Sequence, residues 1–213
     1  MTPAEWQVLH TVALASLLAW ASGIRLYLVV FAVGLAGHLG YIELPPGLMV
    51  LQHPWVIGAA GILLLLEFLV DKVPGVDSLW DALHTFIRIP AGALLAAGAA
   101  GEGMSALTVA AGLLGGTITA GTHFAKAGSR AMINASPEPL SNWAASFTED
   151  GLALAGIWLA LHFPFVFLAL LAVFVALVIW LLPRLWRGIA GMWRLLRTRS
   201  MIVRETRREE QRP

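Results

Sequence analysis

The chain has 213 residues, of which 58% are hydrophobic and only 13% are charged, and its mean hydropathy is +0.76. A soluble domain carries about twice that share of charged residues to cover its surface, so the composition excludes an ordinary soluble protein. Because the chain contains no cysteine, disulfide bonds, thiolate metal sites and cysteine nucleophiles are excluded as well.

Charge is divided unevenly along the chain. Residues 1–183 contain five basic and ten acidic residues, whereas residues 184–213 contain nine arginines and three glutamates. A basic segment that directly follows an apolar one is typical of an anchor at an anionic cytoplasmic leaflet, so we expect membrane lipids and no nucleic acid as partners. The first apolar block lacks the basic start of a signal peptide, with Glu5 in its place, and we expect it to be retained.

Seven apolar segments follow one another and predict an all-α, polytopic transmembrane bundle of six or seven segments. Several are shorter than the roughly 20 residues of a straight span, so we expect some to be broken or re-entrant. Turn signals separate them at Ser22-Gly23, Leu44–Gly47, Pro74-Gly75 and Ser136–Pro139. The segments are residues 7–22, 24–41, 54–70, 88–101, 104–122, 145–162 and 164–183.

The basic residues predict an orientation. If the C-terminus is cytoplasmic, counting back through seven segments places the other five basic residues on the cytoplasmic side. The N-terminus and the loops 42–53 and 101–103, which hold no lysine or arginine, then lie outside. We therefore expect a multi-pass protein of the cell inner (cytoplasmic) membrane. For Arg25, beside the first break, we favour a cytoplasmic turn; the alternative is that the break directs helix ends and this arginine at an anion.

Three further features concern organisation. The transmembrane domain covers residues 1–183, a basic amphipathic helix is expected on the membrane surface over 184–200, and a disordered charged tail over 201–213. Glycine and alanine at four-residue intervals within 91–122 predict close helix packing, and they could equally serve a homo-oligomer. A short similarity between the segments beginning at Thr11 and Thr108 indicates a possible internal repeat, which would suit a transporter-like fold.

The first of two polar stretches covers residues 67–88. Glu67 and Asp71 end one apolar helix, and Asp77 is expected to cap the next one. On that second helix, four polar residues follow at i, i+4, i+7 and i+11, a spacing that places them on one face. They are Asp77, Asp81, His84 and Arg88, opposite an apolar side of Leu79, Leu83 and Phe86.

The second polar stretch covers residues 123–150. Lys126, Arg130 and Asn134 follow at four-residue steps before the proline turn, and Asn142, Ser146 and Glu149 form a second stripe after it. Because the two stretches are complementary in charge, we expect acids of the first to pair with basic residues of the second. The predicted binding site combines both stretches and consists of Glu67, Asp71, Lys72, Asp77, Asp81, His84, Arg88, Lys126, Arg130, Asn134, Asn142, Glu149 and Asp150.

Ionised groups at membrane depth persist when they are paired, hydrated or functional. The stretches could form structural ion pairs in a non-catalytic scaffold or assembly factor. They could instead form the polar site of a small transporter or channel-like protein for an ion or metabolite, which is the interpretation we favour, with acids handling a proton or cation. An enzyme is the third alternative. Asp77, Asp81 and His84 could ligate Mg²⁺ or Zn²⁺, but such a face more often forms ion pairs. No HExxH, nucleophile elbow or P-loop occurs, so we expect no catalytic residues, metal or cofactor.

The same stretches carry a family resemblance. EFLVDKVPGVDSLWDALHTFIRIPAGALLAAGA at 67–99 and KAGSRAMINASPEPLSNWAASFTEDG at 126–151 resemble the signature segments of a bacterial integral membrane family of unknown function, the domain-of-unknown-function family 4126. The similarity covers about residues 8–183 and leaves out the basic tail. It implies a multi-span membrane protein, with no established activity and no catalytic or binding residues to transfer.

Overall fold

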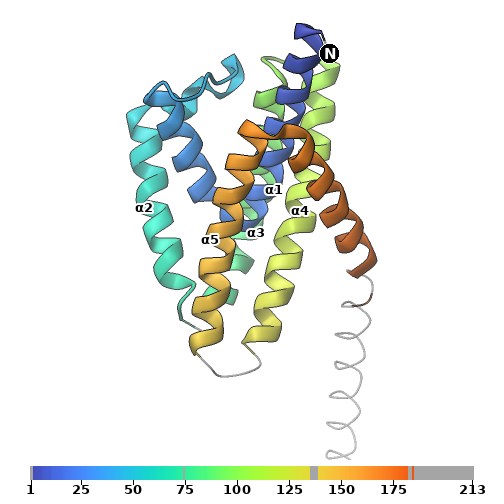
Figure 1. Cartoon of the computed structure of the whole chain (residues 1–213). Helices are drawn as coiled ribbons and strands as arrows, with labels where there is room; N and C mark the ends of the chain where they lie inside the picture. The colour runs from blue at the N-terminus through green and yellow to red at the C-terminus, as the bar shows by residue number, and fades with distance from the viewer. Residues whose placement is uncertain (1, 74, 135–138, 182–183, 185–213) are drawn as a thin grey trace, which may run out of the picture. The chain divides into compact units, whose positions relative to one another are not determined.

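The computed structural model describes residues 2–73, 75–134, 139–181 and 184, and every regular element in this part of the chain is helical. This confirms the predicted all-α bundle. Among the described residues, those up to Val175 form one compact unit, and those from Ala176 onward belong to a second. The elements are α1 (Pro3–His38), the 3₁₀ helix η1 (Pro46–Gln52), α2 (Pro54–Val70), α3 (Val76–Ala100), α4 (Ala106–Ile133), α5 (Pro139–His162) and the helix Pro164–Leu181 (Figure 1).

Helix α1 is folded back at Arg25. A straight helix of its 36 residues would be about 54 Å long, yet Gln7 near its start and Tyr41 just after its end line the same cavity. The backbone leaves the helical region at Arg25, with φ −143° and ψ 72°. Helix α1 therefore consists of two arms that meet at an internal break (Figure 1). These arms are the first two predicted segments, and the break lies close to the predicted Ser22-Gly23.

Small residues let the helices around this break approach closely. A Cβ added at Gly23 would lie 2.7 Å from both the Thr119 carbonyl oxygen and the Thr122 Cβ of α4. Helices α3 and α4 have the most extensive contact in the bundle, where Gly92 faces Thr119 and Gly115 faces Ala96. The predicted packing role of the small residues in 91–122 is confirmed, because a larger side chain at these positions would separate the helices.

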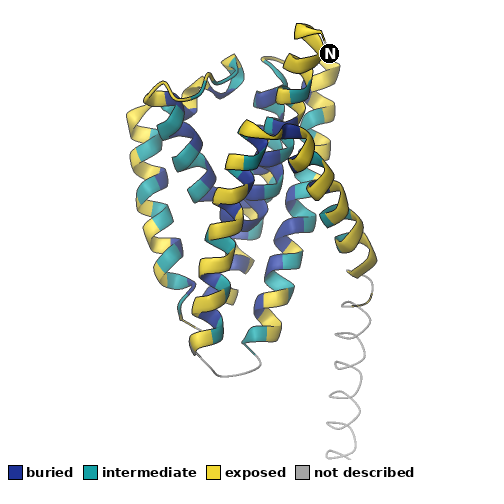
Figure 2. Ribbon diagram, viewed as in Figure 1, coloured by how far each residue is buried: buried dark blue, intermediate teal, exposed yellow. Residues whose placement is uncertain are grey.

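The bundle buries charged side chains and exposes many large apolar ones. Figure 2 shows which positions along the helices are buried and which are exposed. Phe86 and Trp55 are each 83% exposed, whereas Arg25 and Arg88 are 0% exposed. This distribution is the reverse of that in soluble proteins and suits a hydrocarbon solvent. Among the described residues, α1, α3 and Pro164–Leu181 are long and apolar enough to cross a membrane. Taken together as one span, η1 and α2 would be a fourth, bent by 67°.

One local prediction is wrong. Helix α3 begins at Val76 with Gly75 as its N-cap at φ +85°, so Asp77 lies in the first turn instead of at the cap. The Asp77 carboxylate accepts the backbone N–H of Gly75. Arg25 lies at the break of α1, and its side chain is fully buried. Most of the predicted turn at 136–139 and of the predicted basic helix and tail at 184–213 lies outside the described residues.

Candidate functional site

Charged side chains from five helices meet inside the bundle and form ion pairs with one another. Both predicted polar faces, Asp77 to Arg88 on α3 and Lys126 to Arg130 on α4, point into this group. Arg88 lies 12 residues after the first residue of α3, about 18 Å along the axis, so the group extends about halfway along that helix. We call it the ion network; its members are Arg25, Glu67, Asp71, Asp77, Asp81, Arg88, Lys126, Arg130, Glu149 and Asp150.

Arg25 links α1 to α2 and α5. Its guanidinium forms an ion pair with Asp71 and lies 2.8 Å from a carboxylate oxygen of Asp150 and 3.3 Å from one of Glu149. It also donates to the Ser146 hydroxyl at 2.8 Å. The guanidinium fork can serve several acceptors at once, which is why an arginine can be fully buried here.

Arg88 and Lys126 occupy the middle of the network. Arg88 forms an ion pair with Glu67 and donates to Asp81 at 2.9 Å. The Lys126 ammonium donates to the carbonyl of Ile24 at 3.1 Å, directly before the break in α1. Around this ammonium lie four carboxylates at 3.4–3.8 Å, those of Asp81, Glu149, Glu67 and Asp71. These distances exceed those of tight charge-assisted hydrogen bonds, so Lys126 is shared among the acids.

Arg130 closes the network toward the turn between α2 and α3. It donates from Nε and Nη2 to the two carboxylate oxygens of Glu149, at 2.9 and 3.0 Å. Asn134 donates to both carboxylate oxygens of Asp77 at 2.8 and 3.0 Å, and Asn142 donates to the Asn134 side chain at 2.8 Å. This end of the network is therefore held by amides as well as by ion pairs.

Acids exceed bases in the ion network, which holds six carboxylates and four cationic side chains. Three buried carboxylate oxygens, Glu67 Oε2, Asp71 Oδ1 and Asp81 Oδ2, have no hydrogen-bond partner among the described residues. An unpartnered buried oxygen is costly, and so is excess charge in an apolar bundle. A bound proton or cation would reduce both costs.

Eleven of the thirteen predicted site residues contact the ion network directly, or belong to it, and two lie at its margin. Lys72 points away, with its ammonium over the Phe68 ring and donating to the Phe68 carbonyl. Desolvation lowers the pKa of Lys72, while the nearby Asp150 opposes this. The His84 ring bonds to the backbone carbonyl of Trp80 and stacks on the Trp80 ring. No bond between His84 and an acid is described.

Two residues outside the predicted set also contact the ion network. Arg25 is absent from that set because a lone arginine between apolar segments is typical of a turn. The His123 ring lies 3.5 Å from the Arg88 guanidinium and bonds to Thr85 at 2.7 Å. Its position three residues before Lys126, on the same helix face, is the sequence signal for this contact. Within the described residues, no three His, Asp or Glu side chains are grouped as metal ligands.

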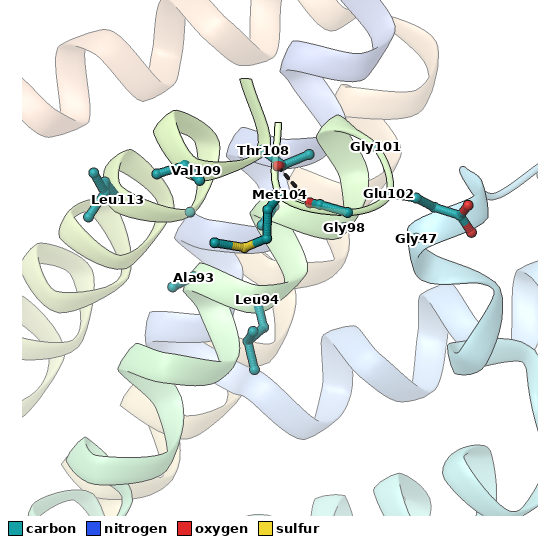
Figure 3. Close-up of a pocket in the computed structure, with 13 residues that line it drawn as sticks. Gly47, Ala93, Leu94, Gly98, Gly101, Glu102, Met104, Thr108, Val109 and Leu113 are labelled. Carbon is teal, nitrogen blue, oxygen red and sulfur yellow. Dashed lines mark hydrogen bonds between the residues drawn. The ribbon is translucent and has the colours of Figure 1, made fainter. Parts of the chain in front are cut away.

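Four cavities lie outside the ion network, and none of them is lined by its members. The cavity in Figure 3 lies beside the α3–α4 connection, where Thr108 donates to the Gly103 carbonyl at 2.8 Å. Glu102 lines this cavity with its carboxylate directed away from Met104 and Leu113 (Figure 3). These four cavities are therefore separate from the ion network.

Fold and site together define a polytopic α-helical membrane protein with charged side chains paired in its interior. Residues 12–184 match the family described as Domain of unknown function (DUF4126), and the chain belongs to this family. The match includes the whole ion network. No curated protein and no solved structure gives a significant match.

Proposed function

We propose that this protein is a small transporter or channel-like protein whose ion network binds a proton or a small monovalent cation. The observation that carries the proposal is the excess of acids, together with the three unpartnered carboxylate oxygens of Glu67, Asp71 and Asp81. These oxygens belong to neighbouring residues, because Lys126 lies within 3.8 Å of all three carboxylates. A cation held there would be coordinated by oxygen, the ligand that hard cations prefer.

Lys126 is the residue whose contacts a bound proton or cation could replace. Because its ammonium is shared among four acids, a proton or cation that arrives at Asp81 or Glu67 can take over part of its role. Arg25, Arg88 and Arg130 remain in place, since each contacts two or more partners. We further propose that the 71–75 turn faces the cytoplasm, since the loops at the other end hold no lysine or arginine.

The test is ion flux into proteoliposomes under an imposed membrane potential, with an internal dye for protons and with Na⁺ and K⁺ as tracers. The parent protein should carry at least one of these ions. Asp81→Asn should reduce the flux at least about tenfold, because it removes one negative charge from the network. Glu102→Gln is the matched control, because Glu102 is exposed and outside the network, and should leave the flux unchanged. Flux no greater than that of empty liposomes for all three ions would rule the proposal out.

A non-catalytic scaffold or assembly factor is the second candidate. It is favoured by the density of pairing, since every member of the ion network contacts an opposite charge, and by the position of the four cavities away from it. In that case the charges would only stabilise the fold. The ion-flux experiment separates the two candidates, because a scaffold carries no ion.

A further inference from the structure

A second polar feature lies at the end of the bundle opposite the turn that closes the ion network. It is a cavity of about 740 Å³, lined by the start of α1, the loop 41–46, the last residues of α3 and the last residues of α5. We call it the outer cavity. Its polar lining consists of Gln7, His10, Thr11, Tyr41, Glu43 and His162.

The outer cavity has a charge bias that favours cations. Glu43 contributes a carboxylate, and no lysine or arginine lines the cavity. The segments around the cavity, residues 2–14, 39–53, 99–108 and 157–162, contain three glutamates and no lysine or arginine. A concave surface with charge of one sign raises the local concentration of the opposite ion.

An apolar layer separates the outer cavity from the ion network. Leu14 lines the cavity, and Arg25 follows 11 residues later, about 16 Å along the first arm of α1. Between them, Leu17 and Leu18 are fully buried in the hydrophobic core. An ion could not cross this layer without movement of the arm.

We propose that the outer cavity is the vestibule through which a small monovalent cation or proton reaches the ion network, and that Leu17 and Leu18 form the barrier between them. The proposal rests on the function proposed above. The first arm of α1 carries both the cavity wall and the barrier, and it ends at the break at Arg25. The break is the hinge at which this arm tilts to open the barrier.

The test uses single cysteine variants, which the cysteine-free chain makes unambiguous. Purified Leu14→Cys is treated in detergent with membrane-impermeant methanethiosulfonates, one cationic and one anionic. After each rate is corrected for the reagent's reaction with a free thiol in solution, the cationic reagent should modify Leu14→Cys about tenfold faster than the anionic reagent does. Two controls should each react at least about tenfold more slowly than Leu14→Cys. Leu17→Cys lies in the apolar layer. Val8→Cys lines a different groove on the apolar surface.

A charge control tests whether Glu43 causes the preference for the cationic reagent. In the Leu14→Cys protein, Glu43→Gln should bring the two rates close together. Glu102→Gln removes the same charge at the same end of the bundle, but Glu102 does not line the outer cavity, so the preference should remain. If Leu14→Cys does not react, or if the anionic reagent reacts as fast as the cationic one, the outer cavity is not a cation vestibule.

Ion uptake links the vestibule to the network. Leu14→Cys protein modified with the cationic reagent should lose at least about nine-tenths of its uptake in proteoliposomes, because a fixed positive charge blocks the path. Full modification with normal uptake would overturn the vestibule and leave the proposed function intact. No uptake by unmodified parent protein would overturn the proposed function, and the vestibule with it, whatever the labelling rates.

Discussion

Arg25 and Asp71 form an ion pair across 46 positions of sequence, and this contact joins the break in α1 to the end of α2. Both side chains are completely buried. The pair is also the meeting point of the basic residues, because Lys126 and Arg130 reach the same Asp71 carboxylate at 3.8 and 3.6 Å. The bend of α1 and the ion network therefore depend on each other.

Removing Arg25 should be strongly destabilising. Arg25→Gln leaves Asp71 and Asp150 without their principal cation, and breaking a buried pair from one side costs about 3–5 kcal/mol. The measurement is the free energy of unfolding in mixed micelles, from an SDS titration. Arg184→Gln removes an equal charge at an exposed position and should change stability by less than about 0.5 kcal/mol. Equal losses of unfolding free energy in the two variants would show that the buried ion pairs of Arg25 do not stabilise the fold.

A double-mutant cycle should find coupling between Asp81 and Arg88. Their side chains are 2.9 Å apart, so Asp81→Asn and Arg88→Gln together should cost less than the sum of the single changes, by about 1–3 kcal/mol. Asp81 and Arg130 have no direct contact and are linked only through shared neighbours, so the coupling between Asp81→Asn and Arg130→Gln should be smaller than that of the first cycle. The same SDS titration measures both cycles, and strong coupling in the second would contradict this map of the network.

Gly23→Ala should destabilise the bundle by about 2 kcal/mol or more, because the new Cβ would overlap the Thr119 carbonyl and Thr122 of α4. Gly58→Ala is the matched control within helix α2, where an added Cβ meets nothing within 4 Å. It should be neutral or should stabilise by about 0.5–1 kcal/mol, because alanine favours helix over glycine. Thermal unfolding in detergent measures both; a neutral Gly23→Ala would disprove the close approach of α1 and α4.

Lys126→Gln should make stability depend on pH more steeply than in the parent. Without the ammonium, the six acids face three cations, and protonation of an acid relieves the imbalance. The folded state then binds protons that the unfolded state does not, so stability falls as pH rises. Melting temperatures in detergent between pH 5 and 8 should show a larger decrease for Lys126→Gln than for the parent. Lys72→Gln, outside the network, should follow the parent.

The sequence by itself determined the class of protein and the two polar faces. Composition and apolar block length are sufficient for a membrane bundle, because hydrocarbon accepts only helices with closed backbone hydrogen bonds or closed barrels. Helical spacing placed Asp77, Asp81 and Arg88 on one face and Lys126 and Arg130 on another, and opposite charge predicted that these faces meet. Periodicity is a local property, so these conclusions needed no knowledge of packing.

Only the tertiary structure decided which charges join the network and how the two arms of α1 pack around its break. Arg25 enters the network because Gly23 packs against Thr119 and lets α1 bend inside the bundle. Lys72 is left at the margin because its side chain lies on the Phe68 ring instead of facing inward. The outer cavity is likewise formed by four segments distant in sequence. Such features depend on long-range contacts, and spacing along a single helix carries no information about them.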